Sequence, residues 1–214
     1  MLKVHVSITD TLIIFFLTLG PLKAIGPFMQ LTQGTAPEFR RNLAWRGTII
    51  ATVIVLAVAL LGAVILENWH VSIAAVVITG SIILFWQALH LILQPPIQAA
   101  PPGQPGGGPT PAALAPFSLA IPALVTAPGV AAIAAFMAIA GGDWAQKGLV
   151  IAALLVIMAL NLATLLNLDV ILQHVPPPLL KVLGWVMAVL QAALAAQYFI
   201  NGLVRLGALP PFVP

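Results

Sequence analysis

The stretch GPLKAIGPF, at residues 20–28, decides the fold because two prolines six residues apart interrupt an otherwise apolar run. A second stretch, IPALVTAPGV at residues 121–130, carries the same pair of prolines 101 positions later. A proline inside a helix removes one backbone hydrogen bond and clashes with the preceding turn, at a cost of about 3 kcal/mol or more. We therefore expect each pair to unwind about one helical turn, which splits the helix in two.

Composition around these stretches is that of an integral membrane protein. Apolar residues make up 61% and charged residues 6% of the 214 positions, against roughly 45–50% and about 25% in soluble domains. Several uncharged runs exceed the ~18 residues of a membrane-span candidate. The eight basic residues form no stripe, which argues against nucleic-acid binding. The absence of cysteine excludes disulfides and thiolate chemistry.

The fold class predicted is all-α, a polytopic transmembrane bundle. It has six apolar spans with the first and fourth helices discontinuous, at residues 8–33, 47–66, 71–93, 112–140, 148–168 and 180–203. The first span has no small-residue cleavage site after it, so we expect it to be retained. A Pro/Gly-rich, uncharged stretch at residues 94–111 predicts an extramembrane linker between two three-helix units, 1–93 and 112–214.

The two units repeat each other in sequence. Besides the proline pairs, a basic residue followed by glycine opens the second and fifth spans, at residues 46–47 and 147–148. A glycine and a glutamine seven positions apart recur in the third and sixth spans, as Gly80 with Gln87 and Gly184 with Gln191. Because each unit has an odd number of spans, the copies should enter the membrane in opposite orientations, as in inverted-repeat transporters.

The positive-inside rule gives the orientation. With both termini outside, the cytoplasmic side holds Arg40, Arg41, Arg46 and Lys181, and the other side holds Lys3, Lys147 and Arg205. Both termini are therefore expected to be extracytoplasmic.

The paired breaks predict a solute site in the membrane. The segments after Pro27 and Pro128 would start as fresh half-helices, with free N–H groups for a carboxylate and unwound carbonyls for an ammonium. Thr126 would cap the second half-helix. The alternative is that the prolines only kink the helices. Substrate-binding candidates in the breaks are Gly20, Pro21, Lys23, Gly26, Pro27, Pro122, Thr126, Pro128 and Gly129.

Three polar side chains within the spans complete the candidate site. Lys23 lies inside the first break and could pair with an anionic group of the substrate, or could extend to the membrane surface instead. Gln87 and Gln191 could line the cavity or tie helices together. Gly80 and Gly184 are expected to permit close helix approach, and Asn161 to hydrogen-bond to a neighbouring helix.

Other chemistries find no support. The acidic residues fall in loops or at span ends, so proton coupling through a buried carboxylate is not expected: Asp10, Glu38, Glu67, Asp143 and Asp169. No histidine has a second ligand at metal spacing. We therefore expect no metal, no cofactor and no enzymatic activity.

Several motifs resemble the MarC (UPF0056) family of integral membrane proteins. They are FFLTLGPLKAIGPFMQLT, RRNLAWRG, VSIAAVVITGSIILFWQAL, LAIPALVTAPGV and QYFINGL, which begin at residues 15, 40, 71, 119 and 197. The resemblance implies a six-span protein of the cell inner membrane, with relatives that transport small neutral amino acids. The family usually has asparagine where this chain has Gly20, and a small or polar residue where it has Lys23.

The function expected is secondary transport or exchange by alternating access. The solute would be small and polar, and the resemblance implies small neutral amino acids as its class. The other hypothesis is a non-transporting, membrane-embedded partner or assembly protein. The lipid bilayer is the expected surrounding, and the sequence leaves the coupling ion, the direction and a homo-oligomer open.

Overall fold

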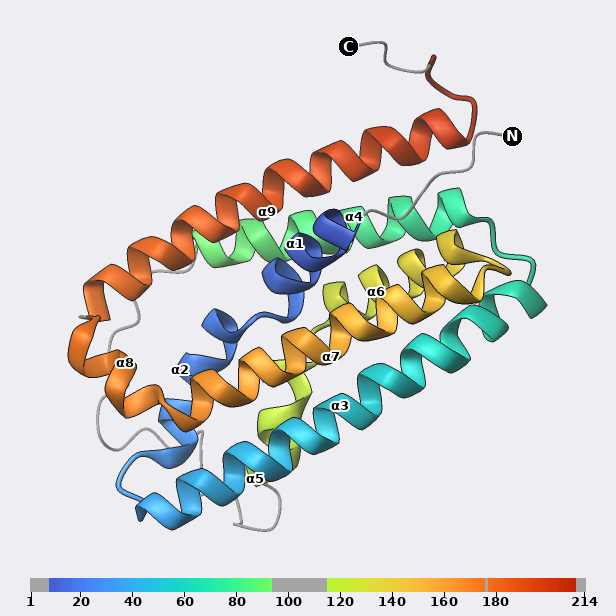
Figure 1. Ribbon diagram of the computed structural model, residues 1–214. Coiled ribbons are helices and arrows are strands. Elements are labelled where there is room, and N and C mark those ends of the chain that lie inside the picture. The colour runs from blue at the N-terminus through green and yellow to red at the C-terminus, as the bar shows by residue number, and fades with distance from the viewer. Residues whose placement is uncertain (1–7, 94–114, 176, 211–214) are drawn as a thin grey trace.

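The computed structural model describes residues 8–93, 115–175 and 177–210, and its regular structure over these residues is helical (Figure 1). The elements in chain order are α1 (Ile8–Leu19), α2 (Pro21–Thr32), α3 (Pro37–Asn68), α4 (Ile73–Leu93), α5 (Ala115–Ser118), η1 (Leu119–Leu124), α6 (Ala127–Ala140), α7 (Trp144–Leu166), α8 (Leu168–His174) and α9 (Pro177–Arg205). The prediction of an all-α protein is confirmed for this part of the chain. The predicted linker at 94–111 lies outside the described residues.

Five helical stretches are long and apolar enough to cross a membrane. They are Thr11–Thr32, Pro37–Gly62, Ile73–His90, Trp144–Leu166 and Val182–Arg205. The predicted fourth span is not among them, because it is divided, as expected, and α6 has 14 residues. At 1.5 Å per residue α6 is roughly 20 Å long, which is shorter than the ~30 Å hydrocarbon core.

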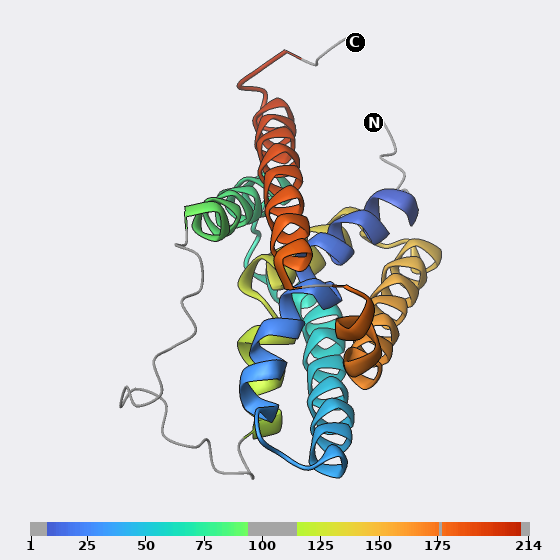
Figure 2. The same cartoon turned by 90° about the vertical axis from the view of Figure 1, so that its left-hand side faces the viewer.

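The helices run between two ends of the molecule. Figures 1 and 2 both show α1 beginning and α9 ending at the same end, which we call the termini end. The α2–α3 and α7–α8 connections lie at the other end, and we call it the Arg40 end after the residue near the start of α3. In chain order α1 and α2 therefore run away from the termini end, and α6 runs towards it.

The core side chains are apolar and many of them are small, whereas many large apolar side chains lie on the outer surface. In the core Phe15 of α1 meets Phe136 of α6 edge to face, with ring centroids 5.5 Å apart. Alanines on one side of α3 are buried, which lets neighbouring helices approach closely. Large side chains such as Leu61, Trp86 and Val189 are exposed. Exposed apolar surface of this extent fits a protein surrounded by lipid.

The first break is narrower than predicted. Helix α1 ends at Leu19, Gly20 is extended with φ −72° and ψ 166°, and α2 begins at Pro21. Proline suits this first helical position because its missing N–H would have no partner there. Pro27 lies inside α2, which continues through it. The prediction of an unwound turn between the prolines, with a new half-helix after Pro27, is wrong here because Pro21 already starts that half-helix.

The second break lies where it was predicted, between its two prolines. Ile121 has non-helical angles of φ −128° and ψ 122°, and Val125 and Thr126 are extended. Helix α6 then begins at Ala127 with Pro128 in its first turn. The first proline of the pair therefore opens the half-helix in one unit, and the second proline opens it in the other.

Candidate functional site

The two breaks meet through a hydrogen bond. The last carbonyls of a helix have no partner within it, and here Thr18 O at the end of α1 accepts from Thr126 Oγ1 of the second break at 2.8 Å. The next carbonyl, Leu19 O, accepts from Asn161 Nδ2 of α7 at 2.7 Å. Thr18, Leu19, Thr126 and Asn161 are all buried. The unwound backbone of the first break is therefore satisfied by side chains from the second half of the chain.

Thr126 also caps α6, as predicted. Its Oγ1 accepts from Gly129 N at 3.2 Å, so one hydroxyl donates to α1 and accepts from α6. Gly129 is buried against α1, and a Cβ built on it would lie 2.2 Å from Leu19 Cδ2. A residue without a side chain is needed at position 129 for the start of α6 to reach the end of α1.

We expect Gly129→Ala to lower the free energy of unfolding by ~1–3 kcal/mol, because an extra methyl group overpacks the contact with Leu19. Adding Leu19→Ala should recover part of that loss, so the two substitutions should not be additive. Denaturation of the four proteins of this cycle in detergent measures the coupling. Strict additivity would show that Gly129 does not pack on Leu19.

A second polar group, the Lys23 cluster, consists of Lys23 on α2, Gln87 on α4 and Gln191 on α9. Lys23 Nζ donates to Gln191 Oε1 at 2.9 Å and to Gln87 Oε1 at 3.3 Å. Gln191 Nε2 donates to Gln87 Oε1 at 3.3 Å and to Leu84 O at 3.2 Å. Gln191 is 1% exposed. The lysine head is thus directed between α4 and α9, where the two glutamines hold it.

The structure assembles only some of the predicted site residues. Five of them are buried at the breaks: Gly20, Pro21, Thr126, Pro128 and Gly129. Pro122 lies within η1, and its side chain is outside the described set.

Gly26 and Pro27 lie within α2, away from the point where the helix breaks, and Gly26 is exposed. Of the two glycines expected at helix contacts, Gly80 approaches Ala131 of α6, whereas a Cβ on Gly184 would have no atom within 4 Å.

Sequence reasoning missed the part played by two residues. Thr18 supplies a carbonyl that accepts the interhelical hydrogen bond, and a backbone acceptor leaves no trace in residue type. Asn161 was expected to bond to some neighbouring helix, but not to the first break. The available signal was its position, because an amide within a long uncharged span is costly unless it has partners.

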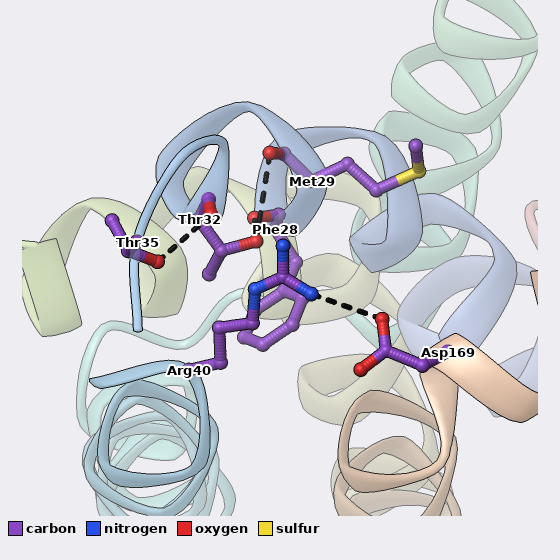
Figure 3. Close-up of polar contacts among 6 residues, drawn as sticks. All are labelled: Phe28, Met29, Thr32, Thr35, Arg40 and Asp169. Carbon is purple, nitrogen blue, oxygen red and sulfur yellow. Dashed lines mark hydrogen bonds and ion pairs between the residues drawn. The ribbon is translucent and has the colours of Figure 1, made fainter. Parts of the chain in front are cut away.

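The hollows near the site differ greatly in size. A cavity of about 10 Å³ lies beside Thr18 and Gln191, which is room for one water at most. A hollow of about 750 Å³ opens at the Arg40 end, between α2, the start of α3, the end of α7 and α8. Its lining includes Phe28 and Arg41, and Figure 3 shows Arg40 reaching across it to Asp169.

The Arg40–Asp169 ion pair joins the two halves of the chain at this hollow. Arg40 Nη1 lies 2.9 Å from Asp169 Oδ1, and the two side chains are 36% and 72% exposed. Thr32 and Thr35 shape the adjoining loop, since Thr32 Oγ1 donates to Phe28 O and Thr35 Oγ1 donates to Thr32 O, both at 2.8 Å (Figure 3).

We expect Asp169→Asn to change the free energy of unfolding by less than ~1 kcal/mol, because solvent screens an ion pair this exposed. Thermal unfolding at low and high salt measures the effect, which should shrink further as salt rises. A loss several times larger would show that the pair is shielded from solvent in the membrane-bound protein.

Comparison with known families matches residues 5–206 to the one described as MarC family integral membrane protein. The chain belongs to the MarC family. Two MarC-type relatives are each described as a UPF0056 membrane protein. One, from Archaeoglobus fulgidus, is 29% identical over 199 residues, which cover 89% of each chain. The other, from Methanocaldococcus jannaschii, is 29% identical over 197 residues, 88% of this chain and 91% of its own. No solved structure matches this MarC-family chain.

This membership confirms the resemblance seen in the sequence, and with it an integral, multi-pass membrane protein. The names of the relatives state no substrate. What the MarC-family site can do chemically must therefore come from its own groups: a lysine ammonium, two glutamine amides and two interrupted helices.

Proposed function

We propose that the protein is a secondary transporter or exchanger that moves a small polar solute by alternating access around the two breaks. The observation that carries the proposal is the hydrogen bond from Thr126 to Thr18 O, because it joins two broken helices inside the membrane-spanning part. Interrupted helices that meet near mid-membrane form solute sites in many secondary transporters. Small neutral amino acids, the class that the family resemblance implies, are the first solutes to test.

We further propose that residues 8–93 and 115–205 are inverted repeats. The helix directions in Figure 1 support this, since α2 and α6 run in opposite senses. The contact between Gln87 and Gln191 also supports it. These glutamines occupy matching positions in the sequence repeat, and residues related by a twofold axis touch each other only near that axis.

If the two units are inverted repeats, the solute site in the described conformation is closed towards one end of the molecule and open towards the other. The α4–α6 pair corresponds to the α9–α2 pair. A Cβ on Gly80 of α4 would lie 3.3 Å from Ala131 of α6, whereas a Cβ on Gly184 of α9 would have no atom within 4 Å. The site would thus be closed towards the termini end and open towards the Arg40 end, and the second state would reverse both contacts.

Three arginines indicate how the protein is oriented in the membrane. Arg40 and Arg41 line the hollow at the open end, and Arg46 follows one to two turns along α3. Under the positive-inside rule this end faces the cytoplasm, so both termini are extracytoplasmic in the cell inner membrane. The conformation described is then the inward-open state.

Uptake into proteoliposomes tests the transport proposal, with a panel of neutral amino acids and small organic acids. Gln191→Leu should lower saturable uptake about tenfold or more, because a hydrogen bond to a charged group contributes ~1.5–3 kcal/mol. Gln197→Leu is the matched control on α9, since Gln197 is exposed and bonds to Asn201. Uptake by this control should stay close to that of the wild type.

Absence of saturable uptake across the panel, or equal uptake by Gln191→Leu and Gln197→Leu, would contradict the proposal. Stable co-purification with another membrane protein in that case would favour the non-transporting partner.

A further inference from the structure

Lys23 is a cation inside the bundle that the described structure does not neutralise. Among the described residues, the ion pair present is Arg40–Asp169, and the oxygens around Lys23 Nζ belong to neutral amides. Of the described carboxylates, Glu38, Asp143 and Asp169 lie at the starts of α3, α7 and α8. A charged side chain at membrane depth is costly and normally pairs with an opposite charge. A negatively charged ligand would supply the missing counter-charge.

The ammonium head has a donor left for that ligand. It carries three N–H groups, and two of them point to Gln87 and Gln191. Gln191 Nε2 already gives both of its hydrogens, to Gln87 and to Leu84 O. The third N–H of Lys23 is therefore the charged donor left in the cluster, and it suits an acceptor with negative charge.

Acceptors for a positive group are scarce at the breaks. The carbonyls of Thr18 and Leu19 already accept one hydrogen bond each, from Thr126 and Asn161, so each has one lone pair left for the ammonium of an amino acid. Among the buried side chains that the structure describes, Asn161 Oδ1 is the acceptor there without a partner. These neutral oxygens do little to balance a second cation close to Lys23, and none of the described carboxylates lies at the breaks. An amino acid would bring its carboxylate and its ammonium together, whereas the site offers a charge for the carboxylate alone.

The surroundings of the cluster suit a short apolar body. The small cavity beside Gln191 is lined by Ile14, Leu17, Leu84 and Leu194, with hydroxyls from Thr18 and Tyr198. We infer that the Lys23 cluster binds a short aliphatic monocarboxylate, with the carboxylate on Lys23 and the carbon chain directed towards these apolar side chains. A single negative charge leaves the loaded site neutral, and that is the form best suited to change conformation within the bilayer. This inference rests on the proposed transport function and narrows its substrate class.

The test compares three solutes that share a three-carbon skeleton: propionate, lactate and alanine. Purified wild-type protein is melted in each at equal ionic strength, with sodium chloride as the reference, because a ligand of the folded state raises Tm. Propionate and lactate should raise Tm by about 2–4 °C or more at saturating concentration, and alanine should not. Lys23→Gln keeps hydrogen-bonding capacity without charge and should abolish the shift, whereas Lys23→Arg should retain it.

The remaining outcomes separate this inference from the transport proposal. Stabilisation and uptake of alanine, without an effect of propionate or lactate, would overturn the monocarboxylate inference and leave the transporter standing. If raising the sodium chloride concentration alone gives a Lys23-dependent rise in Tm as large as that with propionate, the cluster is an inorganic-anion site instead. If Lys23→Gln is too unstable to melt cooperatively, Lys23→Met takes its place and should show no Tm shift, whereas Lys23→Arg should still show one. If no solute raises the Tm of the protein and none is taken up into proteoliposomes, both proposals fail.

Discussion

Gly20→Ala, which adds a single methyl group, is expected to destabilise the folded protein more than any other substitution considered. A Cβ on Gly20 would lie 1.9 Å from the backbone oxygen of Phe16, and a backbone atom cannot rotate away as a side chain can. Moving the end of α1 would also disturb the carbonyls held by Thr126 and Asn161. We expect a loss of more than ~4 kcal/mol in the free energy of unfolding, in the range of exceptional substitutions. Yield of monodisperse protein and thermal unfolding in detergent measure it.

Gly26→Ala is the control within the same stretch of sequence. A Cβ on Gly26 would have no atom within 4 Å, and the residue lies inside α2. Alanine there should change the free energy of unfolding by less than ~1 kcal/mol, because its better helix propensity is offset by its Cβ against the ring of Pro27. If both variants unfold like the wild type, the chain does not break at Gly20 as described.

Releasing both carbonyls of the first break is expected to have the next largest effect. The double variant Thr126→Val and Asn161→Leu keeps side-chain volume similar but leaves Thr18 O and Leu19 O without donors. An unsatisfied buried polar group costs ~1–3 kcal/mol, so we expect the two together to lower the free energy of unfolding by about 2–6 kcal/mol. Chemical denaturation in detergent measures this loss.

Thr164→Val is the matched control for this experiment. Thr164 is on α7 like Asn161, but its hydroxyl donates to Leu160 O of its own helix at 2.9 Å. That carbonyl does not belong to a break, so the control should unfold within ~0.5 kcal/mol of the wild type. A double variant no less stable than the control would mean that water satisfies the break carbonyls instead.

The sequence predicted the helices well, because long uncharged apolar runs leave few alternatives in a bilayer. The prolines predicted that two helices break, and the structure agrees. They did not predict which proline starts each half-helix. That choice depends on partners far along the chain: Thr126 and Asn161 satisfy the carbonyls exposed before Pro21. Local propensity contains no information about those partners.

Lys23 shows the same limit at the level of one side chain. From sequence, a flexible lysine near mid-span could extend to the surface or turn inward. The structure turns it inward because Gln87 and Gln191, on two other helices, supply oxygens at 3.3 and 2.9 Å. The sequence repeat also hides the difference between Gly80 and Gly184, since one is packed and the other is not. Under the proposed alternating access, the two halves of the repeat would exchange these packings between two states, and the structure describes one of them.

A cysteine cross-link tests alternating access most directly, and this chain has no native cysteine to interfere. A Cβ on Gly80 would lie 3.3 Å from Ala131 Cβ, close to the ~3.5–4.5 Å between the Cβ atoms of a disulfide. The double variant Gly80→Cys and Ala131→Cys should therefore lock α4 to α6 when oxidised, with the single variants as controls. Under alternating access, uptake of the transported solute should stop on oxidation and return on reduction. Uptake that continues unchanged in fully cross-linked protein would contradict it.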